Sequence, residues 1–420
     1  ILFKRTNMLV NIDLLNETLS QADSGATLGK LIQQHRDDLG ISQRQLCNAL
    51  DISRRSIQRV VNGEAKGVDA EIIGKIAVFF QIETRELIQT HFAEKGLDGD
   101  LGRTKRLGFV AREFDLVGLR KLGLTDTAAD LEHVEQRVIE FFGYDSIYEY
   151  AEELPLALNS QVQHGVSLKM QRLWASAVHK QFSKIDNDNP FRPDQLKSLT
   201  KEIRRFTKDE EHGFIRFVRR LYQCGVTVIV ESYVANSAVY GATMMVRGRP
   251  CIVITNRDKR YDLLWRTLAH EICHAIAHRR QIQEWGYLVN DDESLCADRV
   301  EEQAEEFAAE VLVPAEKRRL IQPHIHQDLV VRRKAEEWGV HPSIIYGLYL
   351  DRDLKEADPS FRSREYSKFR KKHLISSERA IKSFHHLNTE TWKRKTLDET
   401  VPLLESTLNP NRRTPGQAMT

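Results

Sequence analysis

Two histidines and a glutamate have the spacing of a metal site. His270 and His274 are four residues apart, with Glu271 directly after the first, in a run of good helix formers without proline or glycine. On a helix, residues four apart lie on nearly the same face, so both imidazoles can reach one metal ion. Glu271 lies where a carboxylate can accept a proton from a water molecule at that metal. The H-E-x-x-H pattern therefore predicts a metal-dependent hydrolytic site, although chance produces it in roughly a few per cent of such chains.

A third ligand is expected from the next helix. Residues 299–314 predict a helix whose apolar residues form one buried stripe. Glu301 and Glu305 lie one turn apart on it, so both can face the first helix. Acidic residues in such a run are ordinarily solvated, and only the upstream histidines favour a ligand. Two histidines, one glutamate and an open fourth position are the pattern of a catalytic zinc site.

These two stretches together resemble the ImmA/IrrE family of metallopeptidases. That family pairs an H-E-x-x-H helix, usually preceded by Thr-Leu-Ala, with a later helix of the form E-x-x-A-N-x-F-A-A-x-x-L-x-P. The lead-in here is Thr267 to Ala269. The matching residues of the second helix are Glu301, Ala304, Phe307, Ala308, Ala309, Leu312 and Pro314.

The resemblance implies a zincin-like α+β metallopeptidase domain. Its metal ligands would be His270, His274 and Glu301, and its catalytic base would be Glu271. Zinc (Zn²⁺) is the expected metal on ligand type, with manganese (Mn²⁺) as an alternative because availability can override intrinsic affinity.

The sequence departs from the family pattern at two places. Glu305 stands where the family usually has asparagine, and Ile272-Cys273 stands where it has Leu-Gly. Neither departure removes a ligand or the base. His278 lies one turn beyond the second ligand, where the family often has histidine. Because three ligands are already assigned, we expect His278 and Glu305 to contact the ligands or pack beside them rather than to bind the metal.

Two short helices near the N-terminus have the spacing of a DNA-reading motif. Serines are placed to cap helices at 43–50 and 54–61, with a tight turn between them, as a helix-turn-helix requires. The second helix offers groups that can bond base edges in the major groove, and the start of the first meets backbone phosphate. The expected base contacts are Arg54, Arg55, Gln58 and Arg59, and the expected phosphate contacts are Ser42 and Gln43.

This stretch resembles the XRE (Cro/repressor-type) family. The family pattern S-Q-x-x-L-A-x-x-L-G-I-S-x-x-x-I-S-x-x-x-N-G is matched at Ser42, Gln43, Leu46, Leu50, Ile52, Ser53, Ile57, Asn62 and Gly63. Asp51 replaces a glycine, and aspartate tolerates a left-handed turn better than most residues. The resemblance implies double-stranded DNA as a partner and a homodimer that reads paired half-sites. A small helical protein-binding module with a solvated basic face is the competing interpretation.

Composition indicates the class of protein. With 420 residues, 41% hydrophobic and 29% charged, the chain can form two or three globular domains. Its net charge of +2 implies nothing about nucleic acid, so any such affinity must come from local patches. Five scattered cysteines favour reduced thiols and a cytoplasmic location. We expect no membrane span and no signal peptide, and Met8 is a candidate natural start after Ile1 to Asn7.

The expected fold is mainly α with a small β-sheet. Strands are predicted at 225–233, 238–246 and 251–255, before the H-E-x-x-H helix, where an edge strand can hold an extended substrate. The last segment is rich in lysine and arginine, which predicts a solvated or partly disordered tail, with a second phosphate-binding surface as the alternative. The expected parts are an N-terminal arm (1–24), a helix-turn-helix domain (25–92), a linker (93–129), a helical middle segment (130–222), a zincin-like domain (223–350) and a basic C-terminal extension (351–420).

Three functions compete at this point. The first is a DNA-binding transcriptional regulator fused to a zinc-dependent metallopeptidase that cleaves a repressor or antitoxin protein. The second is a regulator whose zincin-like domain only senses a ligand or partner, and the third is an antitoxin that neutralises a toxin by contact. The intact set of His270, Glu271, His274 and Glu301 favours the first, because a sensor has no need of the base.

Overall fold

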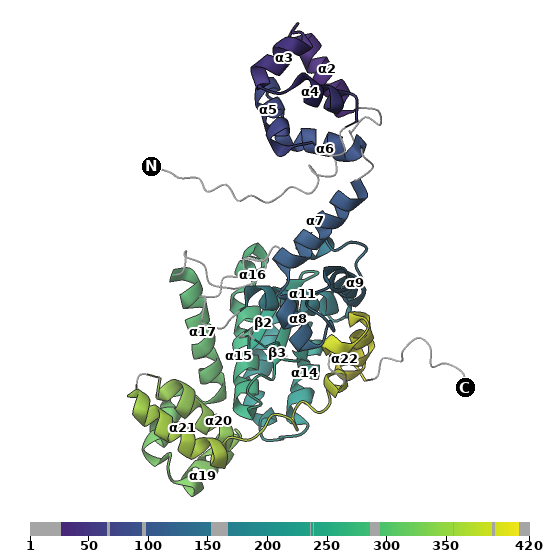
Figure 1. Cartoon of the computed structure of the whole chain (residues 1–420). Coiled ribbons are helices and arrows are strands. Elements are labelled where there is room, and N and C mark those ends of the chain that lie inside the picture. The colour runs from purple at the N-terminus through teal and green to yellow at the C-terminus, as the bar shows by residue number, and fades with distance from the viewer. Residues whose placement is uncertain are drawn as a thin grey trace, which may run out of the picture. The chain divides into compact units, whose positions relative to one another are not determined.

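The chain divides into two compact units, Ile1–Gly108 and Phe109–Thr420 (Figure 1). The computed structural model describes residues 27–64, 68–94, 98–152, 167–235, 237, 239–285, 295–355, 357–388 and 391–410. The expected N-terminal arm (1–24) lies outside the described residues. Each unit has its own hydrophobic core. Among the described helices, none combines the length and the apolar character that crossing a membrane would need.

The first unit is a bundle of short, well-capped helices. The Ser42 hydroxyl accepts a hydrogen bond from the Gln45 amide, and the Gln45 side chain accepts one from the Ser42 amide, which closes a capping box. Asp51 ends the same helix in the left-handed region at φ 51°, and Ser53 caps the next helix. The helices are α2 (Leu28–Asp38), α3 (Gln43–Leu50), α4 (Arg54–Val61), α5 (Ala70–Phe80) and α6 (Thr84–Glu94).

The stretch expected to be a linker is helical. Helix α7 (Asp98–Glu113) and helix α8 (Leu116–Leu122) occupy most of 93–129. Phe109 and Val110 on α7 are buried in the core of the second unit. The glycines and charges of this stretch suggested a linker, but burial of its apolar side chains outweighs a helix cost of about 1 kcal/mol per glycine.

The second unit contains a mixed sheet of three strands. Strands β1 (Thr227–Glu231), β2 (Gly241–Val246) and β3 (Arg249–Thr255) are arranged in the order β1-β3-β2. Strand β3 pairs parallel with β1 and antiparallel with β2, which leaves β2 at an edge of the sheet. The expected fold class, mainly α with a small sheet, is thereby confirmed.

Helices precede the sheet and follow it. Helix α15 packs against β2 and β3 on one side and against α17 on another, so α15 lies between the sheet and α17 (Figure 1). The helices before the sheet are α9 (Leu131–Phe142), α10 (Glu149–Glu152), α11 (Leu168–Lys184), α12 (Pro193–Lys201), α13 (Ile203–Phe206) and α14 (Gly213–Gln223). Those after it are α15 (Tyr261–Ala277), α16 (Arg279–Trp285), α17 (Leu295–Leu312), α18 (Ala315–Ile321), α19 (Asp328–Trp338), α20 (Pro342–Leu348), α21 (Pro359–His373) and α22 (Val401–Leu408).

The described part of the C-terminal extension is folded onto the second unit, contrary to the expected tail. Phe369, Phe384 and Trp392 are buried in the main core. These apolar side chains lie among many charges in the sequence, which obscured them. The remaining short elements of the second unit are η1 (Gln322–His324), the π-helical η2 (Tyr349–Asp353), η3 (His385–Asn388), η4 (Thr391–Lys393) and η5 (Leu397–Thr400).

A cluster of buried polar side chains connects this extension to the sheet by hydrogen bonds. Glu231 at the end of β1 accepts hydrogen bonds from Gln181 Nε2 (2.8 Å) and Thr391 Oγ1 (3.2 Å). His386 Nε2 lies 3.4 Å from Glu231 Oε1 and 2.8 Å from the carbonyl oxygen of Val230. All four side chains are almost fully buried. We call Gln181, Glu231, His386 and Thr391 the Glu231 cluster.

Candidate functional site

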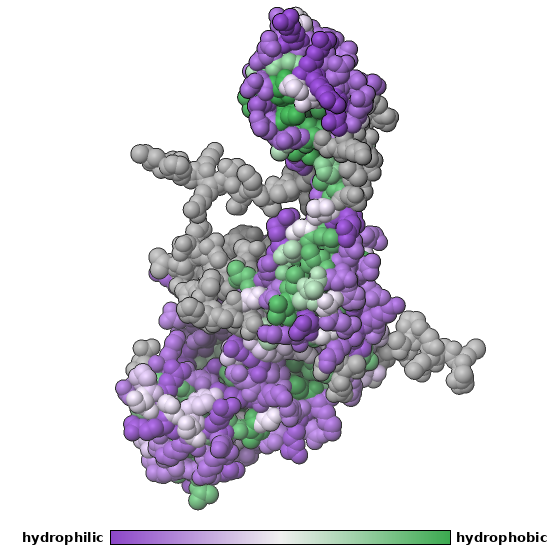
Figure 2. Space-filling view, viewed as in Figure 1, coloured by the Kyte–Doolittle hydropathy of each residue, from purple (hydrophilic) through white to green (hydrophobic). Residues whose placement is uncertain are grey.

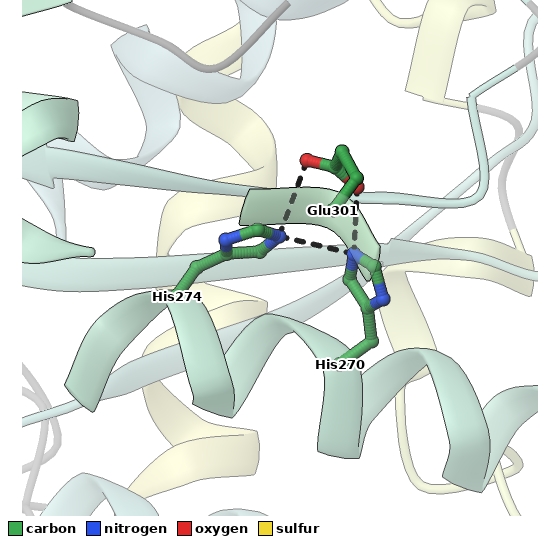
Figure 3. A group of neighbouring side chains, drawn as sticks. All are labelled: His270, His274 and Glu301. Atoms are coloured by element: carbon green, nitrogen blue, oxygen red, sulfur yellow. Dashed lines mark hydrogen bonds and ion pairs between the residues drawn. The ribbon is translucent and has the colours of Figure 1, made fainter. Parts of the chain in front are cut away.

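Three predicted ligands converge between α15 and α17 (Figure 3). His270 Nε2 lies 3.1 Å from Glu301 Oε2, and His274 Nε2 lies 3.0 Å from His270 Nε2 and 3.4 Å from Glu301 Oε1. The three ligand atoms all lie within 4.8 Å of one another. Ligands on a tetrahedral zinc with bonds of about 2.0–2.1 Å are about 3.3 Å apart. The donor set therefore fits a zinc ion in both chemistry and spacing.

The pKa values of His274 and Glu301 are shifted in the directions that favour binding of a cation. Burial, together with repulsion from His270, lowers the pKa of His274 to about 3, so its imidazole is neutral and offers a lone pair. Burial opposes ionisation of Glu301, yet its hydrogen bond with His270 and the nearby imidazoles hold its pKa below the usual range. Two nitrogen donors and one anionic oxygen are the set expected at a catalytic zinc site.

A chain of hydrogen bonds orients one ligand. His274 Nδ1 lies 3.0 Å from His278 Nδ1, and His278 Nε2 lies 3.1 Å from Gln303 Oε1 on α17. When His274 Nε2 faces the metal position, its Nδ1–H donates to His278, whose Nε2–H donates to Gln303. His278 thus lies beside a ligand, where the sequence placed it. Nothing in the sequence predicted a role for Gln303, because the family pattern specifies no residue at this position.

Glu305 lies outside the group of three. Its side chain is exposed on α17, one turn beyond Glu301. Burial lowers the pKa of His270, whereas the hydrogen bond with Glu301 raises it. The negative charge of Glu305 also raises the pKa of His270, by less than the hydrogen bond does. Glu305 therefore acts on the ligands through its charge rather than by joining them.

Glu271 is held against strand β2. Glu271 is 5% exposed, and Thr243 Oγ1 lies 2.8 Å from its Oε2 and 3.0 Å from its backbone oxygen. Burial raises the pKa of Glu271 to about 7, against the lowering effects of His270 and Thr243. A carboxyl group of this pKa can both accept and return a proton near neutral pH.

A glycine leaves room for this carboxylate. A Cβ atom at Gly241 would lie 2.7 Å from Thr267 Cγ2 and 3.0 Å from Glu271 Oε1. Any larger residue at the start of β2 would therefore displace the base or its helix. Gly241 and Thr243 were not predicted, because only the packing of β2 on α15 brings them to the site.

The predicted DNA-reading residues lie together on α4. Arg54, Arg55, Gln58 and Arg59 are all exposed, while Ile57 and Val60 on the opposite face are buried. The remaining two predicted residues are at the start of α3. The hydroxyl of Ser42 takes part in the capping box and Gln43 is half-buried. The structure thus gives α4 an exposed polar face that holds all four residues expected to contact bases.

Family comparisons agree with the two parts recognised in the sequence. Residues 223–346 match the family model of the IrrE N-terminal-like domain, which is a peptidase family. Residues 32–87 match the helix-turn-helix family model. No curated protein and no solved structure was significantly similar to the chain. The match at 223–346 contains both α15 and the ligand-bearing turn of α17.

Proposed function

We propose that this chain, which joins a helix-turn-helix domain to an IrrE N-terminal-like domain, is a DNA-binding regulator with a zinc-dependent peptidase activity. The observation that carries the proposal is the convergence of His270, His274 and Glu301 within 4.8 Å, beside the buried carboxylate of Glu271. A binding module that only senses a partner needs no proton acceptor next to its metal.

The chain's own residues can carry out peptide hydrolysis at this site. A zinc ion held by His270, His274 and Glu301 would act as a Lewis acid on the peptide carbonyl and on the attacking water. Glu271 accepts the proton of that water and returns it to the leaving amine. Thr243 holds the Glu271 carboxylate in place. Strand β2, which is an edge strand of the sheet formed by the described residues, can align an extended peptide by backbone hydrogen bonds.

The substrate class follows from the pairing of the two domains. A peptidase carried by a DNA-binding chain is brought to other proteins at the same regulatory DNA, and a repressor or an antitoxin fits this setting. Helix α4 would read base edges through Arg54, Arg55, Gln58 and Arg59, and two copies of the chain would read paired half-sites.

Replacing the base tests the peptidase against the sensor. Glu271→Gln keeps the ligands and nearly the same shape, so it should retain metal and DNA binding and lose cleavage. In cells carrying a reporter of the regulated promoter, this variant should hold the target repressed under conditions where wild type releases it. Normal regulation by Glu271→Gln would exclude proteolysis as the working mechanism and support the sensor.

A matched control removes the metal instead of the base. His274→Ala should abolish both metal binding and release of the target. If the metal is only structural, His274→Ala disrupts regulation whereas Glu271→Gln does not. The two variants therefore separate catalysis from metal-dependent folding.

A further inference from the structure

Helix α21 carries an unusual concentration of exposed positive charge. Of its 15 residues, six are exposed lysines or arginines, and its only acidic residue, Glu365, is 6% exposed. The exposed cations are Arg362, Arg364, Lys368, Arg370, Lys371 and Lys372. The region of α19 and α21 is mostly hydrophilic on the face shown in Figure 2.

Three of these cations form a straight row on the outer face of the helix. Arg364, Lys368 and Lys371 follow the spacing i, i+4 and i+7, which places them on one side of a helix over about 10 Å. Glu365 and Phe369 lie on the neighbouring side of the helix, and both are buried. We call Arg364, Lys368 and Lys371 the basic ridge.

The ridge is only weakly neutralised by the protein. Among the described residues, the side chains of Arg364 and Lys371 form no ion pair. Lys368 Nζ lies 4.0 Å from Glu365 Oε1 and 3.1 Å from His326 Nδ1. The Glu365 carboxylate also accepts a hydrogen bond from Tyr349, so the positive charge of the ridge remains available to an anionic partner.

The helix itself is held firmly. Tyr349 OH donates to Glu365 Oε2 at 3.0 Å, and Arg260 Nη1 donates to Tyr366 OH at 3.1 Å. Arg260 also bonds to Asp351 (2.8 Å) and to Asp262 at the start of α15. Cations on a fixed helix lose less freedom when they bind than cations on a loose tail do.

We propose that the basic ridge binds the phosphate backbone of duplex DNA, as a second DNA contact outside the helix-turn-helix domain. Lysine and arginine rows that face solvent neutralise phosphates without reading sequence. The chain already has a domain of a DNA-reading class at 32–87, so duplex DNA is the polyanion that the second unit meets at highest local concentration. The ridge would strengthen binding to any sequence and leave discrimination to α4.

The salt dependence of binding tests the ridge. The full chain is titrated against a short fluorescein-labelled duplex of arbitrary sequence at several salt concentrations between about 50 and 200 mM. Arg364→Gln, Lys368→Gln and Lys371→Gln combined should reduce the slope of log K against log salt by about 2–3, since each phosphate contact contributes about 0.9. Affinity at the lowest salt should fall by about tenfold or more.

A second triple variant removes the same charge elsewhere. Lys197, Lys201 and Arg205 are exposed on α12 and α13, and Lys197 lies 3.8 Å from Asp194. Their combined change to glutamine should alter the slope by less than about one. An unchanged slope in the ridge variant, or an equal change in the control, would overturn the proposal. Thermal melts of both variants show whether either result reflects misfolding.

Two further binding experiments distinguish the DNA contact of the basic ridge from that of the helix-turn-helix domain, and DNA from other anionic partners. Arg54→Ala with Arg55→Ala should still bind the arbitrary duplex with a ridge-dependent slope, and adding the ridge changes should remove that binding. If the ridge variant loses affinity for single-stranded RNA or an acidic peptide but not for the duplex, the partner is not DNA and the proposal is wrong.

Discussion

Two groups of histidine and glutamate lie in the second unit, one partly exposed and one buried, and they are built in opposite ways. At the candidate metal centre, nitrogen and oxygen atoms of His270, His274 and Glu301 point at one another across 3.0–3.4 Å. In the Glu231 cluster, the carboxylate oxygens face donors on Gln181 and its neighbours. A bound cation would hold the ligand atoms of the first arrangement together, whereas in the second the Glu231 carboxylate accepts hydrogen bonds from protein donors.

The difference shows what to look for in a buried His–Glu pair. Residue type is the same in both groups, so residue type alone does not indicate a metal. Convergence of ligand atoms from two helices does, and the Glu301 side chain is 41% exposed, whereas the Glu231 cluster is almost fully buried. The Glu231 cluster instead joins segments that are far apart in sequence, so we expect it to stabilise the folded state.

The largest expected effect is on stability, from the Glu231 cluster. His386→Ala removes a donor from a buried carboxylate and leaves a hole, which should lower the free energy of unfolding by about 3 kcal/mol. Chemical denaturation measures this. The pair of half-exposed His326 and buried Glu365, 3.3 Å apart, is the control. Glu365 keeps its hydrogen bond from Tyr349, so His326→Ala should cost less than about 1 kcal/mol. Metal content should not change in either variant.

The same cluster predicts a pH dependence. Burial would raise the pKa of Glu231, but the bonds from His386 and Gln181 hold it below the usual 4.5. A carboxylate with a lowered native pKa stabilises the fold above its unfolded pKa, and this is lost as pH falls through the native value. Wild type and His386→Ala should therefore approach equal stability on acidification, and a constant gap would contradict the assignment.

A smaller effect is expected at the metal centre from His278→Ala. This change removes the partner of His274 Nδ1 and should weaken metal affinity by about 10–100-fold without abolishing binding. Competition with a chelating dye measures the affinity. Glu305→Gln is the matched control, because it changes a nearby charge but no hydrogen bond to a ligand. Equal affinities of wild type and His278→Ala would show that the hydrogen-bonded chain does not support the ligand.

The smallest effect is expected on the exposed face of α4, where the arginine side chains are neither buried nor gathered around a common ligand position. Arg54→Ala should reduce discrimination at one base by about 1–3 kcal/mol and leave metal content unchanged. Mobility-shift competition between the preferred sequence and single-base variants measures this. A uniform loss over all sequences would instead assign Arg54 to phosphate contact.

Local sequence spacing predicted the elements that carry the site. The helix of His270 and His274, the helix of Glu301 and the limits of α3 and α4 all follow from short-range patterns and caps. Such features depend on residues within one or two turns, so the local sequence is enough to predict them here.

Contacts between distant segments could not be predicted. Thr243 and Gly241 reach Glu271 only because β2 packs on α15, and Gln303 meets His278 across two helices. The folded C-terminal extension was missed for a related reason. Its few buried aromatic side chains are outnumbered by charges, and their burial depends on the core formed by earlier residues.

Metal content is the most direct test of the central claim, that His270, His274 and Glu301 form a catalytic metal site with Glu271 as its base. Full-length protein is purified in zinc-containing medium, and metals are counted per chain by mass spectrometry for wild type, Glu271→Gln and His274→Ala. One zinc ion is expected in wild type and in Glu271→Gln, and almost none in His274→Ala. Equal metal in His274→Ala and wild type, or loss of metal in Glu271→Gln, would contradict the assignment of ligands and base.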